Sequence, residues 1–148
     1  TQRRRQRQMC IRDRIIINDG EVRMLAEDDN LIRASRQLIG MVGCQTLIIK
    51  KGENGVLAFH GDDMIALPAY PTENVVDPTG CGDSFAGTIA ACLAANNGPI
   101  SKSELRDALI RATVTASFTL ESFGTSGLIG LTLEKFKLRL AQFEEILS

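Results

Sequence analysis

Residues 75–91, VVDPTGCGDSFAGTIAA, contain the residue types and spacing that could do chemistry. Asp77 precedes a glycine turn, and Asp83 follows it at the start of a small-residue run typical of a helix. The first amides of a helix have no partners within it, and the helix dipole makes that end electropositive. Gly80 and Gly82 let the backbone bend so that these amides point into one concavity. The pattern predicts an anion site, typically for phosphate.

Asp83 is the unusual member of this turn, because its carboxylate repels the phosphate that the amides attract. As a helix cap it would stabilise the chain by about 1 kcal/mol, a role that Ser84 could fill without the repulsion. As a general base it could face the acceptor of the phosphoryl group and take its hydroxyl proton. The local stretch leaves both roles, cap and base, open.

Two better-known phosphate loops do not fit the sequence. A Walker A loop requires a Gly-Lys dipeptide, which the chain lacks. A dinucleotide fingerprint requires a third glycine where Phe85 stands. The acid that this fingerprint needs some 20 residues later would fall within a helix that begins at Ser101. An oxidoreductase module of the Rossmann type is therefore disfavoured.

Composition limits the class of protein. The 148 residues, 44% hydrophobic and 24% charged, are typical of one soluble domain. An apolar run of about 18 residues, which a membrane span would require, is missing from the sequence, so a membrane partner is not expected. Four cysteines without a C-x-x-C pair and a single histidine argue against zinc and favour a reducing, cytoplasmic compartment.

The charge is uneven along the chain. Residues 1–14 hold six arginines and one acid, so the remainder carries a net charge of −6 although the whole chain carries −1. An acidic body argues against nucleic acid as a partner. Residues 1–13 are interpreted as a non-native or disordered leader, and residues 14–148 as the folded part. If the leader is non-native, the chain is a fragment.

The order of elements indicates an α/β protein. Strands are expected at 14–19, 46–50, 56–60, 64–70 and 73–77, the one at 64–70 running antiparallel at one side of the sheet. A first helix is expected within 20–30, and a second follows a cap at Asp29 or Asn30. A third is expected at 84–96, a fourth after a capping box of Ser101 and Glu104, and a last one from Thr132, with a loop at 123–130 before it. Alternating strands and helices imply a layered sheet covered by helices, with the ligand at the carboxyl ends of its strands.

The segment DPTGCGDSFAG (77–87) closely resembles a signature of the ribokinase-like, or phosphofructokinase-B (PfkB), family of carbohydrate and nucleoside kinases, D-[TP]-x-G-A-G-D-x-F-x-G. Three segments are similar to other parts of that family in the same order: IIINDGEVRML (15–25), TLIIKKGENGVLAF (46–59) and FTLESFGTSGL (118–128). The resemblance implies a ribokinase-like three-layer α-β-α sandwich, Rossmann-like and present as a partial domain. Residues 14–148 would be the C-terminal part, with the nucleotide site and the catalytic loop.

The resemblance also implies roles in the glycine turn. Asp83 would be the general base that deprotonates the acceptor hydroxyl. The amides of Gly80, Cys81 and Gly82 would form the anion hole for the transferring phosphoryl group. Cys81 replaces the usual alanine, a change that a nest built from backbone can tolerate.

Further residues match family positions for ligands and cations. Asn18 and Glu21 match an N-x-x-E pair that orients Mg²⁺ and its waters, although Glu21 could simply favour a helix dipole. Asp77 and Thr79 match positions that help to hold a monovalent cation such as K⁺ in many members.

The nucleotide itself would be bound elsewhere in the sequence. Gly52 and Gly55 match the turn that lines the nucleotide site, with Lys50 beside it, and Thr113 falls on the helix that flanks the adenine. Lys50 could instead be a solvated strand end, and Thr113 a plain helix residue.

The resemblance therefore implies an ATP-dependent phosphotransferase that moves the γ-phosphoryl group to a hydroxyl of a sugar or nucleoside. The alternative is an inactive fragment that serves only as a nucleotide-binding module. The family's N-terminal half, which carries most of the acceptor pocket and the lid, has no counterpart in this sequence. The sequence therefore does not identify the acceptor. It also leaves open whether the full-length parent is a homodimer.

Overall fold

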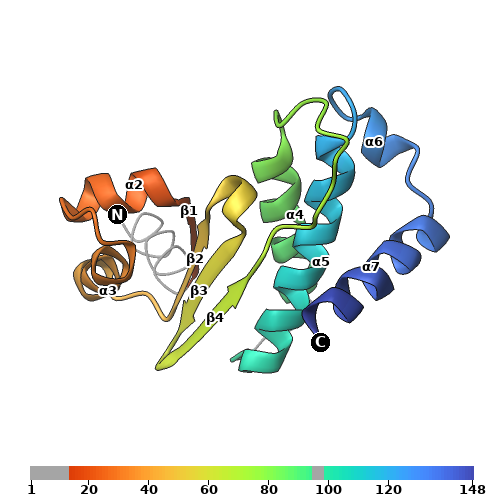
Figure 1. The fold of residues 1–148 in the computed structure, drawn as a ribbon. Coiled ribbons are helices and arrows are strands. Elements are labelled where there is room, and N and C mark those ends of the chain that lie inside the picture. The colour runs from red at the N-terminus through yellow and green to blue at the C-terminus, as the bar shows by residue number, and fades with distance from the viewer. Residues whose placement is uncertain (1–13, 95–98) are drawn as a thin grey trace, which may run out of the picture. The chain divides into compact units, whose positions relative to one another are not determined.

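The computed structural model describes residues 14–94 and 99–148 and divides the chain into two compact units (Figure 1). The first unit ends at Ala66 and the second begins at Leu67. The leader predicted at residues 1–13 and the last residues of the helix predicted at 84–96 lie outside the described residues.

The first unit is built on a mixed sheet. Its strands are β1 (Arg14–Asn18), β2 (Thr46–Lys50), β3 (Val56–His60) and β4 (Asp63–Leu67), in the order β1-β2-β3-β4. β1 and β2 are parallel, whereas β2 and β3 are antiparallel. The first four residues of β2 are buried, as an unbroken apolar run predicts.

Two helices cover one face of this sheet. α2 (Asp19–Ala26) begins directly after β1, and α3 (Leu31–Val42) begins after an N-cap at Asn30, whose side chain accepts the Arg33 amide. The helices and the sheet share a core of buried residues: Val22, Ala34, Leu38, Cys44, Leu47, Ile49, Leu57 and Phe59. Burying this apolar surface is what holds the helices on the strands.

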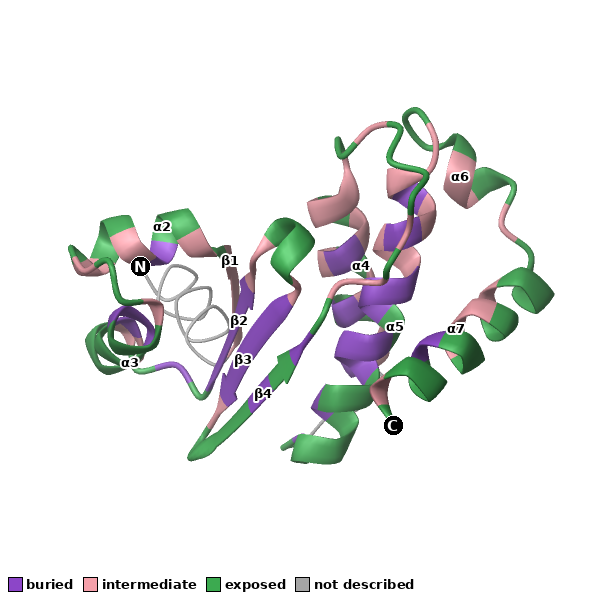
Figure 2. Ribbon diagram, in the orientation of Figure 1, coloured by how far each residue is buried: buried purple, intermediate pink, exposed green. Residues whose placement is uncertain are grey.

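The second unit is helical, with α5 (Lys102–Leu120) at its centre. α4 (Cys81–Ala94), α6 (Ser126–Ile129) and α7 (Leu133–Leu147) each pack against α5. Within this unit, Figure 2 shows most of the buried positions on α4 and α5. The buried core residues of these helices and of α7 include Phe85, Ile89, Leu93, Leu105, Leu109, Ala112 and Phe143. The helices are held by burial of apolar stripes rather than by sheet pairing.

The predicted helix starts of α5 and α7 are confirmed. Ser101 Oγ accepts the Glu104 amide at 3.1 Å, and the Glu104 carboxylate accepts the Ser101 amide at 2.8 Å, so the capping box is complete. Thr132 Oγ1 accepts the Lys135 amide at 3.2 Å at the start of α7.

The strand predicted at 73–77 is wrong. The amides of Val76 and Asp77 both donate to the Leu120 carbonyl, at 2.9 and 3.1 Å, and Val75 is 61% exposed. The last carbonyls of a helix have no partner within it. This segment therefore caps the carboxyl end of α5 instead of pairing with a strand.

Two helix boundaries also differ from the prediction. α4 begins at Cys81 rather than at residue 84, so that Cys81, Gly82 and Asp83 form its first turn. The loop predicted at 123–130 contains the short helix α6. In both places the small or polar composition suggested a loop, but packing against α5 allows helical geometry.

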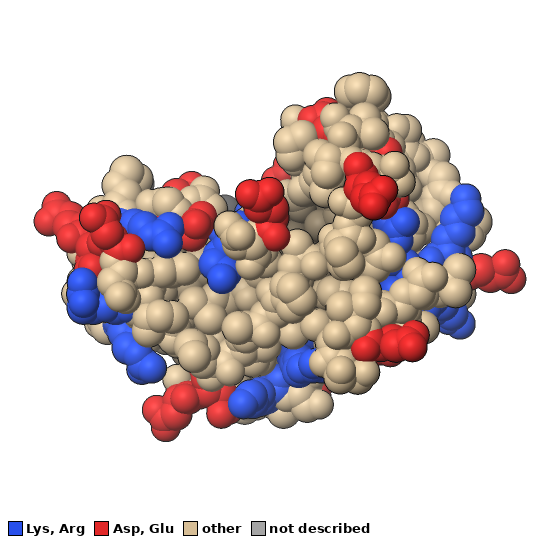
Figure 3. Space-filling view, viewed as in Figure 1, with Lys and Arg blue, Asp and Glu red and all other residues tan. Residues whose placement is uncertain are grey.

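The surface carries charges of both signs. On the face that Figure 3 shows, Lys and Arg side chains of the described residues are interspersed with Asp and Glu. Within the described ranges, none of the helices is both long enough and apolar enough to cross a membrane.

Candidate active site

The glycine turn is a tight turn that leads into α4. The Cys81 amide donates to the Pro78 carbonyl at 3.2 Å, and Gly80, the third residue of this turn, has a φ of +86°. A type II turn requires positive φ at that position, which glycine adopts without steric cost. The Ser84 amide then donates to the Gly80 carbonyl at 2.9 Å, which makes Gly80 the N-cap by position.

The residues whose amides are free at this helix start differ from the predicted ones. The Cys81 amide is used by the turn, whereas those of Gly80, Gly82 and Asp83 have no acceptor in the described part of the chain. Gly82 and Asp83 are the second and third residues of α4, where helix amides lack partners. An anion placed here would meet these amides and the positive end of the helix dipole.

Asp83 does not cap α4. The cap position belongs to Gly80, and the Ser84 hydroxyl donates to the Cys81 carbonyl at 3.1 Å, so Ser84 does not cap it either. The Asp83 side chain is exposed, and its carboxylate has no hydrogen-bond or ion-pair partner among the described residues. The carboxylate is thus accessible at the edge of the free amides, as a general base must be.

Cys81 is turned toward α5. Its thiol donates to the Ala116 carbonyl at 3.6 Å. Burial raises the pKa of the Cys81 thiol, and the negative charge of Asp77 raises it further. A neutral thiol packed on a neighbouring helix fits a structural role and adds no negative charge beside the free amides.

Asp77 and Thr79 fix the start of the turn. The Asp77 carboxylate accepts the Thr79 amide at 3.0 Å. This bond, and a second from the Thr79 hydroxyl, lower the pKa of the Asp77 carboxyl. Asp77 is therefore a carboxylate at neutral pH, able to face a cation while it holds the loop.

Thr119, which the sequence analysis did not single out, contacts Ser84 at the candidate site. The buried Thr119 hydroxyl donates to Ser84 Oγ at 3.0 Å and ties the first turn of α4 to the end of α5. A Cβ built on Gly80 would lie 3.8 Å from Thr119 Cγ2. The two side chains are 35 positions apart in sequence, and no local pattern signals such a contact.

In the first unit, Asn18 and Glu21 bond to each other. The Glu21 amide donates to Asn18 Oδ1 at 2.8 Å, and the Asn18 amide donates to Glu21 Oε2 at 3.2 Å. The pair is a complete capping box at the start of α2. Lys50 lies opposite Asn18 in the register of β1 and β2, so these two residues lie at the carboxyl ends of parallel strands, and Glu21 follows in the first turn of α2.

Gly52 and Gly55 form the turn that follows β2. They lie at the start of and directly after the 3₁₀ turn η1 (Gly52–Asn54), with φ of +57° and +90°. The Lys51 amide donates to the Gly55 carbonyl at 2.8 Å and closes the turn. The first unit thus brings Lys50 and both glycines to the same strand ends as Asn18.

Thr113 lies within α5. Its side chain is buried, and its hydroxyl donates to the Leu109 carbonyl one turn earlier at 2.8 Å. This bond is typical of a threonine in a helix interior. It satisfies the hydroxyl without a ligand.

Comparison with known proteins decides the family. The family model described as pfkB family carbohydrate kinase matches residues 12–129. This chain belongs to the pfkB family. The ribokinase-like fold expected from the resemblance is confirmed by solved structures of kinases with that fold.

Two named relatives are a cytidine kinase and a bifunctional protein. The chain is 41% identical over 76 residues to a cytidine kinase of Thermococcus kodakarensis, a match that covers 50% of this chain and 27% of that protein. It is 32% identical over 104 residues to the bifunctional protein HldE of Pseudomonas aeruginosa, covering 70% of this chain and 20% of that protein.

A solved kinase structure is similar to this chain in fold. Aminoimidazole riboside kinase from Salmonella enterica, crystallised with aminoimidazole riboside and an ATP analog, has a TM-score of 0.74 and 25% identity. The match covers 86% of this chain and 42% of that one. The chain therefore spans less than half the length of the relatives named here.

The site residues predicted from the resemblance fall into two groups, one in each unit. The second unit holds Asp77, Thr79, Gly80, Cys81, Gly82 and Asp83, with Thr113 further along on α5, and the first holds Asn18, Glu21, Lys50, Gly52 and Gly55. Asn18 and Glu21 are both exposed; Glu21 Oε1 is not used in the capping box, and Asn18 Oδ1 accepts one bond there and has a second lone pair. Because Mg²⁺ keeps several of its waters, exposed amide and carboxylate oxygens fit a role in holding those waters.

Proposed function

We propose that this chain is the nucleotide-binding and catalytic part of an ATP-dependent phosphotransferase whose acceptor is a hydroxyl of a sugar or nucleoside. The observation that carries the proposal is the helix start of α4, where an exposed, unpartnered Asp83 carboxylate adjoins amides without acceptors. The match to the pfkB family of carbohydrate kinases supports it, and so do the names of two similar proteins, a cytidine kinase and an aminoimidazole riboside kinase.

Asp83 would act as the general base. Its carboxylate takes the proton of the acceptor hydroxyl while the acceptor oxygen bonds to the γ-phosphorus and the bond from that phosphorus to the bridging oxygen breaks, releasing ADP. General base catalysis of this kind contributes roughly 10²- to 10⁴-fold. The phosphorylated acceptor, ADP and the proton held by Asp83 together account for all atoms of the substrates.

The amides at the start of α4 would stabilise the moving phosphoryl group. Of the three amides predicted for the anion hole, those of Gly80 and Gly82 are free, that of Cys81 is used by the turn, and the free Asp83 amide would take its place. These donors are fixed by the helix, so they need no reorganisation as charge develops on the phosphoryl oxygens. We also propose that Lys50, Gly52, Gly55 and Thr113 contact the nucleotide.

Cations would complete the charge balance. Asn18 and Glu21 would hold waters of Mg²⁺, and Asp77 with Thr79 would face a monovalent cation such as K⁺. When bound, Mg²⁺ neutralises part of the phosphate charge.

A second candidate is a nucleotide-binding module without transfer activity. The coverage of only 42% of the riboside kinase structure favours it, because acceptor contacts can lie in the remaining part. Calorimetric titration of the chain with ATP and Mg²⁺, with an ADP-release assay against a panel of sugars and nucleosides, separates the candidates. Binding without transfer favours the module, and rapid transfer by this chain eliminates it.

Substitution of Asp83 tests the base in a polypeptide that includes the rest of the kinase. Asp83→Asn should lower kcat by roughly 10²- to 10⁴-fold and leave ATP affinity nearly intact. Asp107→Asn, which removes an exposed acid from α5, is the matched control and should leave both parameters unchanged. Full turnover in the Asp83 variant would refute the assignment.

A further inference from the structure

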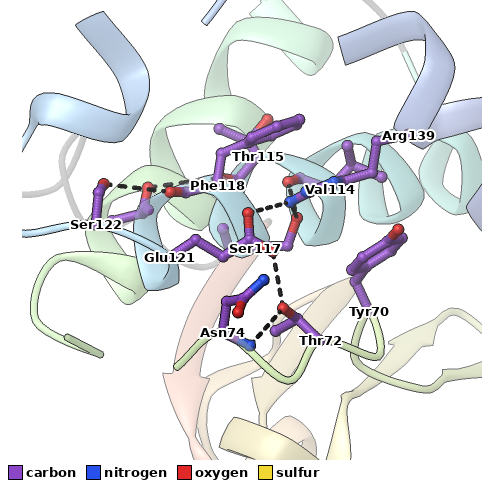
Figure 4. A network of polar contacts seen from close by, with 12 residues as sticks. Tyr70, Thr72, Asn74, Val114, Thr115, Ser117, Phe118, Glu121, Ser122 and Arg139 are labelled. Carbon is purple, nitrogen blue, oxygen red and sulfur yellow. Dashed lines mark hydrogen bonds and ion pairs between the residues drawn. The ribbon is translucent and has the colours of Figure 1, made fainter. Parts of the chain in front are cut away.

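The side chain of Arg139, on α7, is the centre of a polar network in the second unit (Figure 4). Its Nη1 atom lies 2.9 Å from Glu121 Oε2 and donates to Ser117 Oγ at 3.1 Å. Its guanidinium carbon lies 3.9 Å from the centre of the Phe118 ring and 4.9 Å from that of Tyr70. The ion pair is shielded, since the two side chains are only 19% and 20% exposed.

Glu121 extends this network to the segment before the glycine turn. Its Oε1 atom accepts the Thr72 hydroxyl at 2.8 Å, and Thr72 Oγ1 accepts the Asn74 amide at 3.1 Å. The two oxygens of one carboxylate therefore join α7 to residues 72–74 across the end of α5. Figure 4 shows Thr72 directed at Glu121 from that segment.

The same segment continues directly into the site. Two residues after Asn74, the amides of Val76 and Asp77 bond to the Leu120 carbonyl, next to Glu121 in sequence. Asp77 then holds the Thr79 amide at the start of the turn. The contacts that lead from Arg139 to the turn are thus made at residues 117–121, at the end of α5 and directly after it, or on the segment that these residues hold.

We propose that Arg139 and Glu121 are positioning residues for the glycine turn. Together they hold residues 72–77 on the end of α5, and that segment sets where Asp77 and the free amides of α4 lie. The consequence for phosphoryl transfer depends on the proposed function, whereas the positioning itself does not. An arginine suits the role because its planar fork can bond and stack at once, which a lysine ammonium cannot do.

Amide hydrogen exchange in the 148-residue chain, followed by NMR, tests the positioning directly. Thr72→Val removes the link to the segment and leaves the ion pair between Arg139 and Glu121. In this variant the Val76 and Asp77 amides should exchange about tenfold faster, because their bonds to Leu120 open more often. Amides in the middle of α5, such as those of Leu109 and Val114, should keep their rates.

Arg139→Gln should accelerate exchange at Val76 and Asp77 to a similar degree, and adding Thr72→Val should bring little more, because both act through Glu121. Lys137→Gln is the matched control, an exposed charge lost from the same helix, and should change nothing. Unchanged exchange at Val76 and Asp77 in Thr72→Val would overturn the proposal, and so would equal acceleration of every amide. Thr72→Val decides the matter even where Arg139→Gln does not fold.

A second readout separates positioning from stability. The amide signals of Gly82 and Asp83 are followed during titration with ATP and Mg²⁺, and Thr72→Val should weaken the fitted affinity at least about threefold because the amides are no longer pre-organised. Unchanged affinity beside faster exchange would overturn the link to the turn. Failure of the wild-type chain to bind ATP would count against the proposed function, and the exchange rates would still decide the positioning role.

Discussion

At the scale of single residues, Gly80 controls the geometry of the turn. Its φ of +86° is costly for any residue with a Cβ, and the nearest atom to such a Cβ, at 3.8 Å, leaves room for it. Gly80→Ala should therefore destabilise the chain through backbone strain alone, by about 1–2 kcal/mol. Urea denaturation measures this loss in free energy of unfolding.

Gly87→Ala is the matched control for that substitution. Gly87 lies inside α4, is exposed, and has nothing within 4 Å of a Cβ built on it. Alanine there should stabilise the chain by about 0.5–1 kcal/mol, because it restricts the unfolded chain and favours the helix. Equal effects of the two substitutions would contradict the role given to the turn.

The pKa of the Asp77 carboxyl should report on the hydrogen bonds of the same turn. The Thr79 amide, and then the Thr79 hydroxyl, lower the pKa of the Asp77 carboxyl below its ordinary value of 3.8. Because the folded pKa lies below the unfolded one, the stability from this group is complete above the unfolded pKa and is lost as pH falls through the folded pKa. An NMR titration of the carboxyl carbon should place its midpoint below 3.8 in the wild type and closer to 3.8 in Thr79→Ala. A midpoint at or above 3.8 in the wild type would exclude these bonds.

At the scale of elements, the capping box of α2 allows its structural role to be separated from a role with Mg²⁺. Asn18→Ala should cost about 1 kcal/mol of unfolding free energy, whereas Asn18→Asp should cost little, because both Asn and Asp are good N-caps. Ser101→Ala, at the corresponding cap of α5, should cost a similar amount and leave ligand binding unchanged.

The binding measurement for these variants is calorimetry with ATP, in Mg²⁺ and in excess chelator. If Asn18 holds waters of Mg²⁺, Asn18→Ala weakens binding only when Mg²⁺ is present. A loss of affinity that is equal with and without Mg²⁺ would leave Asn18 as a cap alone.

The sequence predicted elements well where one local signal sufficed. Short apolar runs bounded by turn residues predict β1, β2 and β3. The spacing of Ser101 and Glu104 alone indicates the start of α5. Residues 73–77 have the β-branched composition of a strand, but their amides are taken by the Leu120 carbonyl. That partner lies more than 40 positions away, so tertiary contact overrides propensity here.

In the candidate site, the turn glycines and the helix start near Asp83 could be predicted from adjacent residues, because they are local features. The role of Asp83 as a general base stays a prediction. Thr119, Glu121 and Arg139 could not be found in this way. Their importance lies in contacts to Ser84 and Thr72 that only the packing of α4, α5 and α7 creates.

At the scale of the whole molecule, ligand-linked stability tests whether the chain binds ATP with Mg²⁺. Anything that binds only the folded chain stabilises it, by about 2.7 kcal/mol at a ligand concentration 100 times Kd. For a chain of this size that corresponds to a rise in Tm of roughly 5–10 °C. ATP with Mg²⁺ should produce such a rise, which thermal unfolding followed by circular dichroism measures.

The phosphates should account for most of that rise if the amides of Gly82 and Asp83 hold them. Adenosine should therefore raise Tm far less than ATP at equal concentration. Asp83→Asn should show a rise at least as large as the wild type, because removing the carboxylate removes its repulsion of the phosphate, while Gly80→Ala should reduce the rise by disturbing the amides. If adenosine stabilises the chain as strongly as ATP, the helix start of α4 does not bind phosphate and Asp83 loses its place beside the reacting group.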